Sequence, residues 1–284
     1  MFNKAVVGLD RSPAEQPLLS CLSDLTRWGV RSVVLTHVIV VDYVRGAEYG
    51  HEDECRRWLE ERAVPLREAG LEVTVSVSHS GVPAEELLAV ASNHDADLIV
   101  VGSRSHNFMH DLFLGSVAKE VIRKSAIPVL IERLEPAVHG ASESCAAVCS
   151  QKLERILLAT DFSSQSQAAA DAAVTLAPKA ARTDCLTVLP PNDTNNGAND
   201  IERARQALEA IIKRIEAAGG RGQSRIERGD PAEIIARVGQ EGYSLVIVGK
   251  HGRNWIQGML IGSTAAKVCE IAKRPVLMVP SQKE

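Results

Sequence analysis

The chain has 284 residues, a formal net charge of −4 and 45% hydrophobic residues, of which few are aromatic. This length favours two domains, each large enough for its own hydrophobic core. The weak negative charge and the lack of a basic stripe argue against nucleic-acid binding, and no apolar run reaches the roughly 18–20 residues of a membrane-spanning helix. The N-terminal residues enter a strand without a signal peptide, so we expect a cytoplasmic protein.

In the first half, short runs of branched apolar residues alternate with amphipathic stretches of helical period. The strands predicted there are residues 5–9, 32–41, 72–78, 97–101 and 128–132. The helices predicted between them are residues 13–29, 52–69, 83–93 and 115–124. The strand at 72–78 alternates cleanly between apolar and polar residues, which suits the edge of a sheet.

The second half repeats this order. Its predicted strands are residues 155–159, 185–189, 225–228, 244–248 and 275–279. Its predicted helices are residues 163–177, 201–218, 231–241 and 262–273. Such alternation predicts an α/β fold of two domains, each a five-stranded parallel sheet with helices on both faces. We place the domains at 1–133 and 153–284, and a linker rich in small residues at 134–152.

An internal duplication supports this division. Residues 81–105 and 229–252 read almost alike, and each stretch is followed, nine residues later, by a Gly-Ser pair. The part kept in both copies is a strand that ends in glycine, a loop, and a Gly-Ser at the start of a helix. This combination is suited to binding phosphate groups.

Two retained features are expected to meet at the carboxyl ends of the strands, where ligands bind in open parallel sheets. Asp10 and Asp161 follow the first strand of each half, and Gly102 and Gly249 end the fourth. In this topology the first and fourth strands are neighbours. We therefore expect each aspartate and its glycine loop to converge on one crevice.

The loop of the second half runs Gly249-Lys250-His251-Gly252 and, after nine residues, Gly262-Ser263-Thr264. Glycine permits positive φ and lets backbone N–H groups approach an anion. A helix start adds free N–H groups and the positive end of the helix dipole, and Lys250 and Arg253 add charge. The plainer alternative is that these glycines serve only turns and the Gly-Ser pair only a helix start.

The spacing Gly249-x2-Gly252-x9-Gly262-Ser263 resembles the nucleotide-binding motif of the universal stress protein family. The TDFS run at 160–163, the DLIVVGS and SLVIVGKHG strands and the PVLMVP ending resemble that family too. The resemblance covers both halves. It implies tandem Rossmann-like domains of the adenine nucleotide alpha hydrolase-like kind, which bind ATP, with or without Mg²⁺, and pair through their last strands. The two halves would then pair with each other, and a homodimer remains open.

The motif and the resemblance together place ATP mainly in the second half. Gly252 and the helix start would hold phosphates and ribose, and the other residues would line the ribose and base. The nucleotide-binding residues expected there are Ala159, Asp161, Val188, Val248, Gly249, Lys250, His251, Gly252, Arg253, Gly262, Ser263 and Thr264.

The first half departs from the motif, because Ser105 stands where the second glycine belongs. If that position needs positive φ, serine costs about 1 kcal/mol, and its Cβ crowds a phosphate. A weaker second site is therefore expected there. Its residues are Asp10, Val38, Gly102, Arg104, Ser105, Gly115 and Ser116.

Catalysis has little support, since the sequence has no Walker A motif and neither aspartate has a second carboxylate beside it. We predict no catalytic residue and no metal site, and we interpret His37 as a packed or hydrogen-bonded strand histidine. Cys145 and Cys149 are most simply linker thiols. The favoured hypothesis is a cytoplasmic stress-response protein that uses ATP as a regulator. The alternatives are a slow ATPase and a nucleotide-independent scaffold for an unidentified protein partner.

Overall fold

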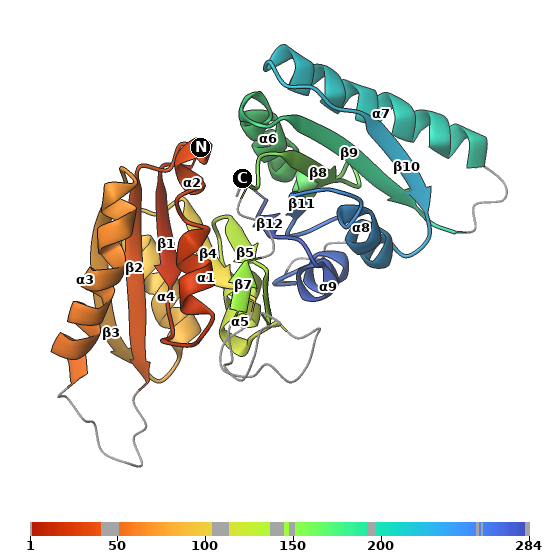
Figure 1. Cartoon of the computed structure of the whole chain (residues 1–284). Helices are drawn as coiled ribbons and strands as arrows, with labels where there is room; N and C mark the ends of the chain where they lie inside the picture. Colours follow the sequence, from red (N-terminus) through yellow and green to blue (C-terminus); the bar gives the residue numbers. More distant parts are fainter. Residues whose placement is uncertain are drawn as a thin grey trace. The chain divides into compact units, whose positions relative to one another are not determined.

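The computed structural model describes residues 2–40, 51–103, 114–136, 145–147, 151–191, 197–253, 256 and 258–281. The chain divides into two compact units, Met1–Ser150 (unit 1) and Gln151–Glu284 (unit 2), coloured red to yellow-green and green to blue in Figure 1. The stretch predicted as a linker contains two short strands, β6 (Leu134–Pro136) and β7 (Cys145–Ala147). These strands pair antiparallel within unit 1.

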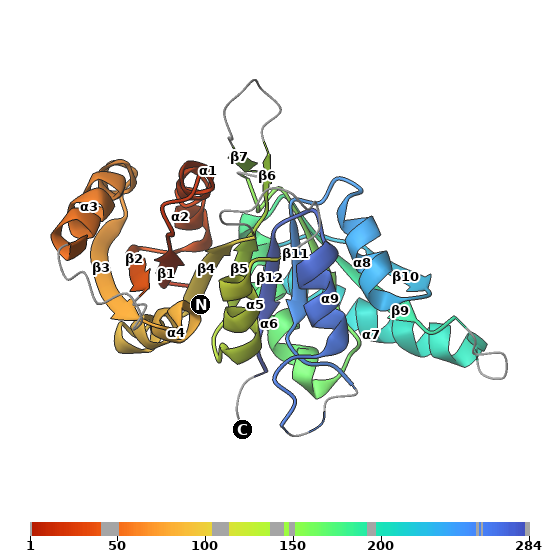
Figure 2. The same cartoon turned by 90° about the horizontal axis from the view of Figure 1, so that it is seen from below.

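Unit 1 is built on a parallel sheet in the order β5-β4-β1-β2-β3. Its strands are β1 (Lys4–Gly8), β2 (Ser32–Val40), β3 (Glu72–Ser80), β4 (Leu98–Gly102) and β5 (Val129–Glu132). Its helices are α1 (Glu15–Ser20), α2 (Leu25–Trp28), α3 (Glu52–Glu68), α4 (Pro83–Asn93) and α5 (Ser116–Lys124). In Figure 2, α1, α2 and α3 lie on one face of this sheet and α4 and α5 on the other.

Unit 2 repeats the arrangement in the order β10-β9-β8-β11-β12, again parallel. Its strands are β8 (Arg155–Ala159), β9 (Arg182–Leu189), β10 (Ser224–Arg228), β11 (Leu245–Gly249) and β12 (Val276–Val279). Its helices are α6 (Gln167–Leu176), α7 (Gly197–Ala217), α8 (Pro231–Gly239) and α9 (Ser263–Ile271), with short 3₁₀ turns at η2 (Ser164–Ser166) and η3 (Ala177–Lys179).

The predicted α/β fold is confirmed, with β3 at an edge and the first and fourth strands of each unit paired in register. Central strands are buried on both faces, as the continuous apolar runs predict: Val6, Val7 and Ile99 are fully buried in unit 1, and Leu157 and Ile247 in unit 2. No helix in the described part of the chain has the length and apolar character needed to cross a membrane.

The helix predicted at residues 13–29 is wrong in one respect, because the chain forms two short helices, α1 and α2. Between them the backbone bonds tighten to i→i−3, from Cys21 N to Leu18 O and from Leu22 N to Leu19 O. Side-chain donors bond to backbone carbonyls here: Ser20 Oγ and Cys21 Sγ both donate to Pro17 O, at 2.7 and 3.3 Å. Such bonds compete with the α-helical ladder and break the helix locally.

Candidate functional site

The same turn follows the first strand in each unit. Asp10 Oδ1 accepts the N–H of Ser12 at 3.1 Å, and Asp161 Oδ1 accepts the N–H of Ser163 at 3.0 Å. The residue in between, Arg11 or Phe162, has a left-handed φ of 58° or 62°, which is uncommon outside glycine. Sequence reasoning missed this left-handed residue, although Asp-x-Ser after a buried strand is a signal for such a turn.

In unit 2, this turn meets the loop after β11. Asp161 Oδ2 accepts the N–H of Arg253 at 2.6 Å, and Arg253 Nη2 donates to Asp161 O at 2.8 Å. The two ends are adjacent because β8 and β11 pair in register, with Ala159 opposite Val248. The predicted convergence of the aspartate and the glycine loop is therefore confirmed in unit 2.

Neither Gly249 nor Gly252 has a left-handed φ, so the positive φ that glycine permits is not used at either position. Close approach explains both glycines instead. A Cβ on Gly252 would lie 2.6 Å from Asp161 Oδ2, and a Cβ on Gly249 would lie 3.1 Å from both His251 O and Ser166 Cα. Ser105, the matching residue of unit 1, and its neighbour Arg104 lie outside the described residues.

Burial and hydrogen bonds shift the pKa values of three side chains at this loop. Desolvation on its own would raise the pKa of Asp161, but hydrogen bonds from Ser163 and from the Arg253 amide outweigh it, so this pKa lies below its ordinary value. Desolvation lowers the pKa of Lys250 to about 8. The pKa of His251 is lowered too, chiefly by desolvation, so its ring is neutral at pH 7.

The start of α9 offers backbone donors to a ligand. Gly262 precedes this helix without a side-chain cap, and its N–H donates to Lys250 O at 2.9 Å, which closes the loop. Among the described residues, the N–H groups of Gly252, Ser263 and Thr264 have no hydrogen-bond partner. Thus the protein's own oxygens engage the amides of Arg253 and Gly262, while three amides of the loop and of the α9 start stay open to an anion.

The expected base wall of unit 2 lies at the ends of three neighbouring strands. Ala159 and Val248 are buried side by side on β8 and β11. Val188 lies half-buried on β9, opposite Glu227 of β10. These apolar groups and the α9 start all lie at the carboxyl ends of the unit 2 strands, where the topology places a ligand.

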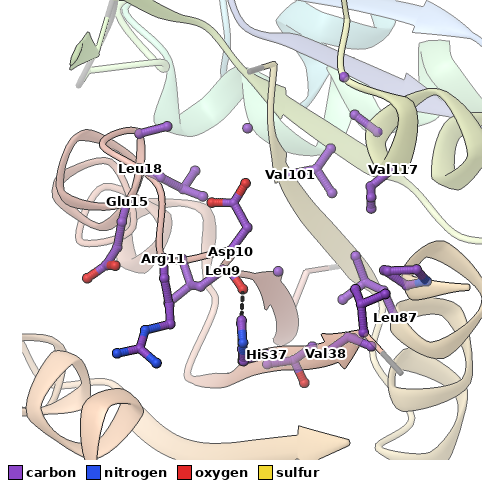
Figure 3. Close-up of a pocket in the computed structure, with 18 of the residues that line it drawn as sticks. Leu9, Asp10, Arg11, Glu15, Leu18, His37, Val38, Leu87, Val101 and Val117 are labelled. Carbon is purple, nitrogen blue, oxygen red and sulfur yellow. Dashed lines mark hydrogen bonds between the residues drawn. The ribbon is translucent and has the colours of Figure 1, made fainter. Parts of the chain in front are cut away.

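Unit 1 holds a cavity of about 540 Å³ at the equivalent place (Figure 3). Its walls are formed by the ends of β1, β2 and β4, the start of α5 and parts of α1, α3 and α4. It brings together the described residues of the predicted second site, which are Asp10, Val38, Gly102, Gly115 and Ser116. His37 also lines it, and its Nδ1 is hydrogen-bonded to Leu9 O at 2.8 Å, which confirms a hydrogen-bonded strand histidine.

The geometry agrees with comparisons to known proteins. A model of the universal stress protein family matches residues 1–133 and again residues 152–280. The chain belongs to the universal stress protein family. Two members, from Mycolicibacterium smegmatis and Mycobacterium tuberculosis, are each 24% identical to the chain over 96% of its length and over 96% and 95% of their own. These family members span both units.

The fold is shared with a solved relative. The crystal structure of a universal stress protein from Archaeoglobus fulgidus superposes with a TM-score of 0.75 at 22% identity and covers 99% of each chain. A shorter relative, the universal stress protein YxiE of Bacillus subtilis, is 29% identical over 148 residues, which is 47% of this chain and all of its own. That match is consistent with a family domain about half as long as this tandem chain.

Proposed function

We propose that this universal stress protein binds an adenine nucleotide in unit 2 and acts in the cytoplasm as a nucleotide-dependent regulator. The observation that carries the proposal is the start of α9, where the N–H groups of Ser263 and Thr264 are uncommitted among the described residues. Lys250 is buried, but Arg253 is an exposed residue of the loop before this helix, so a phosphate there gains both helix-end donors and positive charge.

The residues at the carboxyl ends of the unit 2 strands fit an adenine nucleotide. Phosphates would lie on the amides of Gly252, Ser263 and Thr264, and the base would pack on the apolar wall that includes Ala159 and Val248. The carboxylate of Asp161 already occupies the side of the loop next to Gly252, within 2.6 Å of where a Cβ would be. The anion would therefore lie toward α9 rather than toward β8.

A regulatory role is favoured over fast hydrolysis. Both carboxylate oxygens of Asp161 accept hydrogen bonds, from Ser163 and from the amide of Arg253. A carboxylate engaged in this way is poorly placed to hold a metal ion or to activate water. We expect at most slow ATP hydrolysis. The slow ATPase would be supported instead if the protein released phosphate from ATP and a variant defective in nucleotide binding did not.

Calorimetric titration of the full chain with ATP tests the proposal. Ser263 is exposed at the first residue of α9, so Ser263→Glu places a carboxylate where the helix dipole favours it but where it repels a phosphate. We expect Ser263→Glu to keep the fold and to weaken ATP binding by about tenfold or more.

The control is Ala210→Glu, which adds the same charge at an exposed residue of α7 and should leave ATP binding unchanged. Equal affinity in Ser263→Glu and Ala210→Glu would contradict the proposed site. Wild-type protein that gives neither heat nor a thermal shift at millimolar ATP would contradict nucleotide binding itself and leave the scaffold hypothesis.

A further inference from the structure

We infer that the cavity of unit 1 binds a mainly apolar small molecule that lacks a phosphate chain. Its volume of about 540 Å³ lies within the range of about 300–1,000 Å³ typical of small-molecule sites. This assignment concerns unit 1 alone and does not depend on nucleotide binding in unit 2.

The wall of the cavity is mostly aliphatic. Figure 3 shows Leu18, Val38, Leu87, Val101 and Val117 arranged around one common space. They come from α1, β2, α4, β4 and α5, so five different elements contribute apolar side chains to it. Such a wall stabilises a ligand by removing apolar surface from water, at about 25 cal/mol per Å².

The rim of the cavity is apolar as well. The large apolar side chains that the described part of unit 1 exposes are Val40, Val64, Val82 and Val117. Val40, which is 62% exposed, and Val117, which is 38% exposed, both line the cavity. These two side chains add to the apolar surface that a ligand in the cavity would cover.

Two charged groups at the wall, Arg11 and Glu15, already have ion-pair partners. Arg11 Nη2 lies 2.9 Å from Glu54 Oε1, and Glu15 Oε1 lies 2.5 Å from Arg62 Nε. Both guanidinium groups also lie over the ring of Trp58. In Figure 3 the charged ends of Arg11 and Glu15 point away from the side of the cavity where Val101 and Val117 lie.

Arg11 is the one lysine or arginine among the described residues that line the cavity. A triphosphate there would therefore have to draw Arg11 away from Glu54, or rely on the N–H groups at the start of α5 without a lysine or arginine from the described wall. Either costs binding free energy, because a phosphate gives up its hydration and needs charge-assisted bonds in return.

Asp10 gives the cavity its polar contact. Its carboxylate lies between Leu18 and Val101 (Figure 3), and within the described chain no cation pairs with it. In unit 2 the matching Asp161 instead accepts the amide of Arg253. A carboxylate in this position accepts an N–H or O–H of an uncharged ligand. The start of α5 on the opposite wall offers N–H groups to a neutral acceptor such as a carbonyl oxygen.

The test uses N-phenyl-1-naphthylamine, an uncharged aromatic probe with one N–H group that fluoresces in apolar sites. We expect the full chain to bind one probe saturably, and millimolar ATP to leave it in place. Val117→Asp puts a charge at the rim of the cavity, in the first turn of α5, where the helix dipole tolerates it. It should weaken probe binding by about tenfold or more.

The matched control is Val64→Asp, which makes the same change at an exposed residue of α3 outside the cavity and should bind the probe like wild type. No saturable binding, or equal binding by Val117→Asp and Val64→Asp, would overturn the inference. The inference would also be overturned if ATP displaced the probe from wild type but not from Ser116→Glu, because unit 1 would then be a nucleotide site. The proposal for unit 2 is tested separately, by comparing the ATP affinity of Ser263→Glu with that of its control.

Discussion

At position 252, the space beside the backbone decides which residue fits. A Cβ there would lie 2.6 Å from Asp161 Oδ2, and that oxygen is held by the amide of Arg253 while Oδ1 is held by Ser163. We expect Gly252→Ala to lower the free energy of unfolding by about 1–3 kcal/mol, because the carboxylate must leave at least one charge-assisted hydrogen bond.

Urea denaturation measures this cost, and Gly81→Ala is the control. A Cβ on Gly81 meets no atom within 4 Å, and its φ is not left-handed, so the change should be neutral or slightly stabilising. Equal stability of Gly252→Ala and Gly81→Ala would show that Asp161 moves aside without cost.

Lys250 makes stability depend on pH. It is buried, and desolvation lowers its pKa to about 8, whereas an unfolded lysine has a pKa of about 10.4. Between these values the unfolded chain binds a proton that the folded chain does not, so the free energy of unfolding contributed by Lys250 rises with pH. Below pH 8 the folded protein keeps Lys250 charged and buried, which lowers its free energy of unfolding.

We therefore expect Lys250→Met to stabilise the protein at pH 7 by up to about 3 kcal/mol, and to gain progressively less over wild type as the pH rises toward 10. Other groups titrate in this range, so the readout is the difference in unfolding free energy between variant and wild type at each pH. A difference that does not change from pH 7 to pH 10 would contradict a desolvated lysine.

At the scale of elements, one buried carboxylate ties the strands of unit 2 together near their amino ends. Asp184 of β9 is 2% exposed and accepts hydrogen bonds from Arg155 of β8, from Arg182, from the Tyr243 hydroxyl and from the Gln223 N–H before β10. We expect Asp184→Ala to cost about 2–4 kcal/mol, because it removes the acceptor of the buried Tyr243 hydroxyl and the carboxylate that pairs with the partly exposed Arg155 and Arg182.

A second aspartate provides the comparison. Asp171 of α6 pairs with Arg214 at 2.6 Å, but both side chains are 43% exposed. Such a pair contributes about 1 kcal/mol or less, so Asp171→Ala should shift the thermal midpoint far less than Asp184→Ala. Similar losses from the two substitutions would mean that solvent reaches the Asp184 cluster.

The positions of strands and helices could be predicted because burial on both faces writes continuous apolar runs into the sequence. The break between α1 and α2 could not, since Leu18, Leu19, Leu22 and Leu25 keep helical spacing across it. What breaks the helix is competition for backbone carbonyls by side-chain donors such as Ser20 and Cys21, and apolar periodicity does not report such bonds.

At the scale of the whole molecule, the sequence shows a duplication, and the family model matches both halves. The glycine spacing predicts the site in unit 2, because glycines occur where the backbone and its neighbours approach closely. The cavity described here lies in unit 1, and its size depends on how side chains from α1, α4, α5 and the sheet pack. Packing across separate elements leaves no local pattern, so the sequence predicted a crevice at this place but not its volume or its apolar wall.

The left-handed residue after each aspartate has a consequence for how such sites diversify. Arg11 and Phe162 share a φ near 60° although one side chain is cationic and the other aromatic. The flanking Asp and Ser hold the turn through their own hydrogen bonds, so the middle side chain is not needed to keep its shape. Each unit can therefore carry a different side chain at the middle of this turn. Ligand preference can change there while the backbone conformation stays the same.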